Sequence, residues 1–164
     1  MLSLNGLIIR LCNMKEKNKF YFKWVLINTL AIGVAPRSNN QIDFLEQNGI
    51  KNILNLTSEK EYKPPFELLS RFNYKNISMP DHKSKKVPDI SLIKDAVNYL
   101  EDANKKGPSF VHCLAAVERS PLVCIAYLMR VKKVSLNQSL NYLMQRNRRT
   151  NPLVSQYNIL KEFT

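Results

Sequence analysis

The residue types that could do chemistry are concentrated in one stretch late in the chain. Residues 110–121 read Phe-Val-His-Cys-Leu-Ala-Ala-Val-Glu-Arg-Ser-Pro. An apolar run ends at Cys113, and Arg119 and Ser120 come just before a long apolar segment. This order predicts a strand, a tight loop and a buried helix, with a thiol where the loop starts and a guanidinium where the helix begins.

A loop of this kind suits a tetrahedral oxyanion. Its backbone N–H groups can point inward, and the helix N-terminus adds partial positive charge. The same field favours a thiolate at Cys113, which makes the sulfur nucleophilic. Arg119 can bind two phosphate oxygens with its planar guanidinium. The stretch therefore predicts a phosphate pocket with a sulfur nucleophile at its base.

At these positions the sequence resembles the cysteine-based protein phosphatases, most closely the dual-specificity branch. The family signature is His-Cys, five residues, Arg, then Ser or Thr, and it stands here as His112, Cys113, Arg119 and Ser120. The resemblance implies the cysteine-phosphatase fold, a phosphocysteine intermediate, no cofactor and no metal. It also implies that phosphate is bound by the loop residues Leu114, Ala115, Ala116, Val117, Glu118 and Arg119.

Two loop residues depart from the family pattern. The family usually has glycine three places after the cysteine, where this chain has Ala116. Glycine lets such a loop turn tightly, so alanine is expected to distort the loop or slow turnover. Glu118 places a negative charge on a loop that binds an anion, and we expect its side chain to face away from the pocket.

The other signature residues have both a catalytic and a structural interpretation. Arg119 would stabilise charge on the equatorial phosphate oxygens, or lie on the helix surface. Ser120 would donate its hydroxyl to the thiolate, or cap the helix. His112 is expected to hydrogen-bond the loop backbone and support ionisation of Cys113. Cys124 lies mid-helix among apolar residues and is interpreted as a packing residue.

A phosphate monoester also needs a proton for its leaving oxygen, and Asp81 is the predicted general acid. It follows a predicted strand, and its spacing before Cys113 is similar to that in dual-specificity phosphatases. The alternative is a turn residue. Asp89 is the competing candidate, but its place before a helix explains it as an N-cap.

The chain is strongly basic, with 25 Lys and Arg against 13 Asp and Glu, for a net charge of +12. Such a balance favours anionic partners without choosing among them. One basic group flanks Asp81 (Lys83, Lys85 and Lys86), where it is a solvated surface or attracts substrate. A second lies at a predicted helix end (Arg146, Arg148 and Arg149), where the helix dipole is explanation enough.

Strand and helix patterns alternate along the chain, followed by helices alone. Strands are predicted over 21–27, 30–34, 50–57, 74–79 and 109–112. Helices are predicted to start at or near Ser38, Phe66, Asp89 or Ser91, Arg119, Ser135 and Pro152. This order predicts an α/β domain with a mostly parallel central sheet of about five strands flanked by helices. In such sheets ligands bind at the carboxyl ends of the strands, where Cys113 and Asp81 both fall.

The length of 164 residues predicts one domain. Residues 20–164 are interpreted as the catalytic domain, and residues 1–19 as an N-terminal extension for which disorder is the expectation. No apolar run approaches the ~20 residues of a membrane span, and Arg10 interrupts the stretch that could resemble a signal peptide. Cys12, Cys113 and Cys124 have neither disulfide nor metal spacing, which favours a reducing, cytoplasmic compartment.

The predicted function is hydrolysis of phosphate monoesters, with phosphorylated protein as the substrate and a monomer as the working unit. A phosphate or sulfate anion is expected in the loop, and nucleic acid is not expected as a partner because no basic groove with interleaved aromatics is visible. One alternative is an inactive phosphate-binding pseudophosphatase. The other is a phosphatase of RNA 5′-phosphates, phosphoinositides or phosphoglucan.

Overall fold

The structure is a computed structural model that describes residues 20–163. Its elements in chain order are β1 (Phe22–Leu26), β2 (Leu30–Val34), α2 (Asn39–Gln47), β3 (Asn52–Asn55), α3 (Phe66–Arg71), β4 (Asn73–Asn76), the 3₁₀ helix η1 (His82–Ser84), α4 (Ile90–Asn104), β5 (Ser109–Cys113), α5 (Arg119–Lys132), α6 (Leu136–Arg146) and α7 (Val154–Leu160). The predicted N-terminal extension and Cys12 lie outside the described residues.

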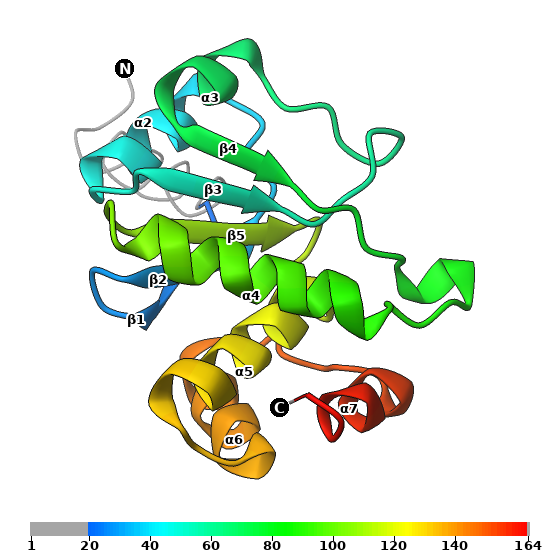
Figure 1. Cartoon of the computed structure of the whole chain (residues 1–164). Coiled ribbons are helices and arrows are strands. Elements are labelled where there is room, and N and C mark those ends of the chain that lie inside the picture. Colours follow the sequence, from blue (N-terminus) through cyan, green and yellow to red (C-terminus); the bar gives the residue numbers. More distant parts are fainter. Residues whose placement is uncertain (1–19, 164) are drawn as a thin grey trace, which may run out of the picture.

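The five strands form one sheet in the order β1-β2-β5-β3-β4 (Figure 1). β1 pairs antiparallel with β2, and the remaining pairs are parallel. β5 lies at the centre, where Cys113 is in register with Val34 of β2 and His112 with Asn55 of β3. The predicted mostly parallel sheet of about five strands is confirmed.

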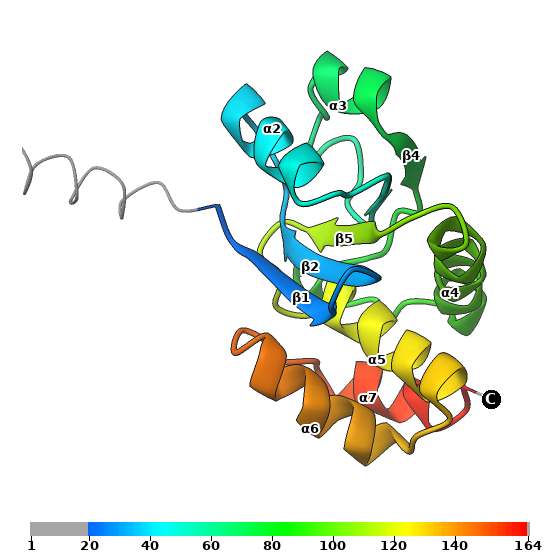
Figure 2. The ribbon, with the colours of Figure 1, turned by 90° about the vertical axis from the view of Figure 1, so that its left-hand side faces the viewer.

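Helices cover both faces of the sheet, with α2 and α3 on one side and α4 and α5 on the other (Figure 2). Successive residues of β5 alternate between the two cores: Phe110 packs under α2 and α3, whereas Val111 packs against α4 and α5. α6 and α7 lie against the outer side of α5. α5 is therefore enclosed by helices and strands, as its apolar sequence predicts.

Two parallel strands are shorter than predicted. The predicted strand over 50–57 is β3, Asn52–Asn55, and the one over 74–79 is β4, Asn73–Asn76. Backbone hydrogen bonds continue past these ends, from Leu56 to His112 and from Met79 to Leu56. The chain then bends at Thr57, whose backbone and hydroxyl donate to the Asn55 carboxamide oxygen.

The helix starts test the predicted caps. Asp89 accepts a hydrogen bond from the Ser91 backbone, and Ser135 forms a capping box with Gln138, so both predictions are confirmed. Ser38 is the N-cap of α2 but makes no side-chain cap hydrogen bond. Pro152 was wrong as the first residue of the last helix: α7 begins at Val154, and the Gln156 side chain accepts from the Leu153 backbone.

The parallel strands place three loops at one edge of the sheet. These loops follow β3, β4 and β5, and they contain residues 56–65, 77–89 and 114–118 respectively. Because β3, β4 and β5 run in the same direction, residues far apart in sequence meet there. Over residues 20–163 no helix has the length and apolar character needed to cross a bilayer.

Candidate active site

The loop between β5 and α5 has the predicted strand-loop-helix form. β5 ends at Cys113 and α5 begins at Arg119. At the turn of the loop Ala116 is fully buried with φ of 58°, a left-handed conformation that glycine adopts without strain. Alanine therefore takes the conformation that the family's glycine would take, with its methyl group packed in the core.

The loop's carbonyl groups are bonded from outside the loop. Asn147 Nδ2 donates to the Ala116 oxygen at 2.9 Å, and the Asn151 backbone donates to the Val117 oxygen at 2.8 Å. Arg149 Nη1 lies 3.3 Å from the Ala115 oxygen. In a trans peptide the N–H points opposite to its carbonyl, so the N–H groups of residues 116–118 face the other way, as an anion-binding loop requires.

Cys113 lies at the base of a cavity of about 220 Å³ lined by the loop and by Asp81, His82 and Lys83. Its sulfur is 3.2 Å from the Ser120 hydroxyl, and only 2% of the residue is exposed. Ser120 can therefore donate a hydrogen bond to a thiolate at this position. The predicted pairing of these two residues is present in the structure.

Arg119 is 3% exposed and forms a bidentate pair with Glu61. Nη1 and Nη2 donate to the two carboxylate oxygens at 2.9 Å each, and Nη1 also reaches the Met79 carbonyl at 3.3 Å. Nε is buried and has no partner among residues 20–163. The pair thus orients the guanidinium and leaves a buried N–H donor at the site.

The pair shifts the pKa of both partners. Burial raises the pKa of Glu61, but the hydrogen bonds from Arg119 and Ser58 outweigh it and the net shift is downward. Burial lowers the pKa of Arg119, but hydrogen bonding to Glu61 and the charges of Cys113, Glu61 and Asp81 make the net shift upward. Both side chains therefore remain charged at neutral pH.

Asp81 lines the same cavity and also caps η1. Its Oδ1 accepts hydrogen bonds from the backbone of Lys83 at 3.1 Å and of Ser84 at 3.2 Å. The turn-residue interpretation thus describes its local geometry, and its place among the residues that line the Cys113 cavity is compatible with the predicted general acid.

Glu118 also lines the cavity, and its side chain extends to the loop that carries Asp81 rather than turning away. Its Oε1 accepts a hydrogen bond from the His82 backbone at 2.9 Å and lies 3.2 Å from His82 Nδ1. The expectation that this side chain faces away from the pocket was wrong. Its carboxylate is hydrogen-bonded to His82, in the loop that carries Asp81.

His112 is fully buried between aromatic rings. It stacks on Phe110 at 5.7 Å and meets Tyr62 edge-on at 5.4 Å. Burial lowers the pKa of His112 to about 3, against the opposing effect of the Cys113 backbone. The opposing effect comes from a hydrogen bond with the Cys113 backbone, whose geometry is too poor for either ring nitrogen to count as fully bonded. The hydrogen bond from His112 to the loop backbone stays a prediction.

The remaining predicted residues have structural surroundings. Cys124 is fully buried in α5, and burial raises the pKa of its thiol, as expected for a packing residue. Lys83 lines the cavity, whereas Lys85 and Lys86 are exposed beyond it. Arg149 does more than face a helix dipole, because its guanidinium stacks on Tyr21 at 3.8 Å beside the loop.

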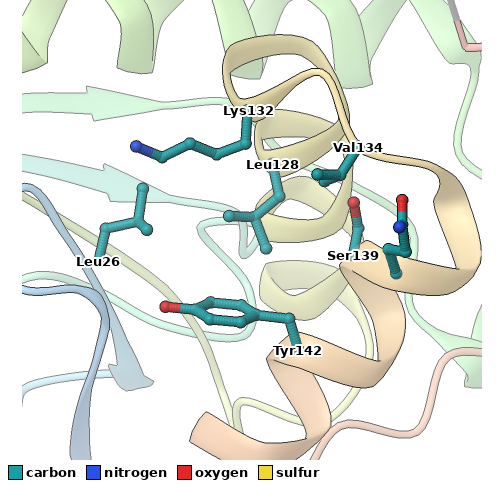
Figure 3. Close-up of a pocket in the computed structure, with 7 residues that line it drawn as sticks. Leu26, Leu128, Lys132, Val134, Ser139 and Tyr142 are labelled. Carbon is teal, nitrogen blue, oxygen red and sulfur yellow. The ribbon is translucent and has the colours of Figure 1, made fainter.

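A second cavity, of about 340 Å³, lies between β1, α5 and α6 (Figure 3). Its walls are mostly apolar, with Lys132 and Tyr142 at its edge. Its lining contains no cysteine, carboxylate or arginine, whereas the Cys113 cavity contains all three, so the Cys113 cavity is the candidate active site. No group of three or more His, Cys, Asp or Glu within the described residues is arranged to hold a metal ion.

Comparison with known proteins agrees with this geometry. The model of the dual specificity phosphatase catalytic domain matches residues 32–164. The chain belongs to this family. It is 35% identical over 124 residues to human dual specificity protein phosphatase 7, and 31% identical over 135 residues to dual specificity protein phosphatase 1-A of Xenopus laevis. These matches cover 75% and 82% of the chain, but 28% and 35% of the relatives' lengths.

Solved structures confirm that the fold is that of the cysteine phosphatases. Tk-PTP in its active form has a TM-score of 0.77 at 19% identity, covering 87% of this chain and 95% of that one. PTPMT1 in complex with PI(5)P has a TM-score of 0.76 at 18% identity, covering 87% and 94%. The human tyrosine phosphatase-like serine/threonine/tyrosine-interacting protein has a TM-score of 0.76 at 21% identity, covering 88% and 96%.

Sequence analysis missed two side chains that support the family's loop. Glu61 lies in the polar stretch after β3, which resembles a solvated loop until the fold places it beside Arg119. Asn147 comes just after α6, yet it is fully buried and bonds both Ala116 and Tyr21. In the sequence Asn147 differs from its neighbours only as an uncharged residue within a basic run. This pattern does not indicate a contact with Ala116, 31 residues earlier.

Proposed function

We propose that this domain hydrolyses phosphate monoesters through a phosphocysteine intermediate, with phosphorylated protein as substrate. The observation that carries the proposal is the cavity in which Cys113, Asp81 and Arg119 meet at the base of an anion-binding loop. The chain spans about a third of the curated relatives' length, so the relatives' activity is a proposal for this chain.

In the first step the Cys113 thiolate attacks phosphorus and the bond to the leaving oxygen breaks. Asp81 gives its proton to that oxygen, so the leaving group departs as a neutral alcohol or phenol. Arg119 and the loop N–H groups stabilise the charge on the three equatorial oxygens.

In the second step water attacks the phosphocysteine and Asp81 takes up its proton. The sulfur–phosphorus bond breaks, and the sulfur departs as a thiolate. The Ser120 hydroxyl, 3.2 Å away, donates a hydrogen bond that stabilises this leaving thiolate. Inorganic phosphate is released, and Cys113 and Asp81 return to their starting states.

The names of the curated relatives support a phosphoprotein substrate, since they are dual specificity protein phosphatases. We expect the cavity, bordered by Lys83, to accept phosphoserine and phosphothreonine as well as phosphotyrosine. The two free, buried cysteines among the described residues support a reducing compartment such as the cytoplasm.

The second candidate is a phosphate-binding pseudophosphatase. Two observations favour it: the left-handed Ala116 and the carboxylate of Glu118 at the anion site. The retained nucleophile, arginine and acid weigh against it. In that case the loop binds phosphate and releases it unchanged.

Turnover of an aryl phosphate separates these candidates. Wild type should release phosphate and be inhibited by vanadate, Cys113→Ser should fall to background, and Asp81→Asn should lose about 10²–10⁴-fold. Wild-type activity no higher than that of Cys113→Ser, with vanadate still bound, would establish the pseudophosphatase instead. The substrate classes are then ranked by measuring kcat/KM on phosphopeptides, a phosphoinositide, an RNA 5′-phosphate and a phosphoglucan.

A further inference from the structure

The residue after the predicted general acid is hydrogen-bonded to the phosphate loop. Glu118 Oε1 accepts from the His82 backbone at 2.9 Å and lies 3.2 Å from His82 Nδ1. The Glu118 side chain is 10% exposed, whereas that of His82 is 58% exposed. The acceptor is therefore held within the site, and the loop that carries Asp81 is attached to it.

Other contacts of Asp81 do not fix its distance from Cys113. Its carboxylate and carbonyl bond only Lys83 and Ser84, within its own turn. Residues 82–87 are exposed, so packing restrains them little. Among the described residues, two hydrogen-bonded links join the loop after β4 to residues 113–119. Arg119 Nη1 reaches the Met79 carbonyl at 3.3 Å, and Glu118 accepts from His82. The first lies two residues before Asp81, whereas the second lies on the adjacent residue, so the Glu118 contact acts directly on the backbone that carries the acid.

We propose that Glu118 is a positioning residue that holds Asp81 over the phosphate loop through the backbone N–H of His82. The proposal rests on the proposed phosphatase function. A negative charge beside the bound phosphate opposes substrate binding, so charge alone gives Glu118 no catalytic value. Its value comes from accepting a hydrogen bond that fixes the position of the acid, since a displacement of about 1 Å can cost 10²-fold in rate.

Comparing kcat on two substrates whose leaving groups differ in their need for a proton isolates the contribution of Asp81. A fluorinated aryl phosphate loses its phenolate without needing a proton, whereas phenyl phosphate needs one. Glu118→Leu removes the acceptor with little change in size, and kcat on phenyl phosphate should fall about 10- to 100-fold. On the fluorinated substrate kcat should change less than about threefold, because Cys113 and Arg119 still act on phosphorus.

Two matched pairs separate hydrogen bonding from charge. Glu118→Gln keeps the accepting oxygen and should restore kcat on phenyl phosphate, with a lower KM because the repulsion is gone. His82→Ala removes the imidazole but keeps the backbone donor, and should retain most activity. His82→Pro removes that donor, and the extended Asp81 backbone (φ −93°, ψ 174°) is compatible with a following proline, so this variant should behave like Glu118→Leu.

Glu59→Leu serves as the control, because Glu59 is an exposed carboxylate on a neighbouring loop. It should leave kcat on both substrates unchanged. Equal losses on both substrates in Glu118→Leu and His82→Pro, or no loss in either, would overturn the positioning role. Failure of the phosphatase proposal is seen separately, as wild type no more active than Cys113→Ser on the fluorinated substrate.

Discussion

Ala116 is a non-glycine residue held at a positive φ within the site. Left-handed backbone costs an L-residue roughly 1–2 kcal/mol, whereas its buried methyl group contributes about 0.8 kcal/mol. The hydrogen bond from Asn147 to the Ala116 carbonyl helps to hold this conformation. The conformation is thus maintained by its surroundings rather than by the residue itself.

We therefore expect Ala116→Gly to raise kcat, because glycine adopts the left-handed turn at this position without the strain that alanine places on the loop. The free energy of unfolding should change by less than about 1 kcal/mol, since relieved strain and lost packing oppose each other. Steady-state kinetics and urea unfolding measure the two effects. Lys133→Gly is the control: φ is 54° there, at the end of α5, and it should leave kcat unchanged. An unchanged or lower kcat in Ala116→Gly contradicts this account.

At the scale of elements, the loop after β3 supplies the partner of Arg119. Glu61 is 23% exposed at its side chain and Arg119 is 4% exposed, so the pair is largely protected from solvent screening. Removing one partner leaves a buried charge incompletely satisfied. The loop after β3 thus stabilises the first turn of α5.

Glu61→Gln should lower the free energy of unfolding by about 1.5–3 kcal/mol at neutral pH and raise KM for a phosphate ester. The net pKa shift of Glu61 is downward, so its stabilising effect is present above the pKa it has in the unfolded chain. That effect is lost as pH falls through the folded-state pKa. Urea unfolding of wild type and variant should therefore converge at acid pH, and a constant difference would argue against the ion pair.

The matched control is Asp102→Asn, which breaks the exposed pair with Lys105. Exposed pairs contribute little, so this variant should unfold like wild type. The contrast tests whether burial, rather than charge pairing as such, gives the Glu61 contact its effect.

How much could be predicted from the sequence depends on how far apart along the chain the contacting residues lie. The Cys113 loop is local, and its strand, nucleophile and arginine lie within a few residues, so the pattern was sufficient. Strand ends were less predictable, because the apolar pattern continues to Leu56 whereas the regular pairing of β3 ends at Asn55. Glu61 and Asn147 act on the loop from 58 and 31 residues away in the chain, and only the assembled fold brings them there.

At the scale of the whole molecule, His112 makes stability depend on pH. It lies in the central strand, and burial lowers its pKa to about 3 from an unfolded value of 6.5. Between these values the unfolded chain binds a proton that the folded protein does not, so stability falls as pH falls. The slope contributed by this residue is about 1.4 kcal/mol per pH unit below 6.5.

His112→Phe keeps a ring in that position and removes the titration. Chemical unfolding from pH 8 to pH 5 should show a shallower loss of stability in the variant. At pH 8 both proteins have an uncharged ring, so their difference there reports packing alone. If the free energy of unfolding falls equally steeply with pH in both proteins, His112 does not control the loss of stability at acid pH.

The underside of the phosphate loop joins the two ends of the described chain. The Tyr21 hydroxyl donates to the Asn147 side chain at 2.6 Å, 126 residues later, and Asn147 in turn bonds Ala116. During synthesis on the ribosome, the nucleophile therefore emerges before the segment that completes its surroundings. A nascent chain halted before residue 147 should hold a reduced thiol but no catalytic loop, so catalytic competence requires synthesis beyond residue 147.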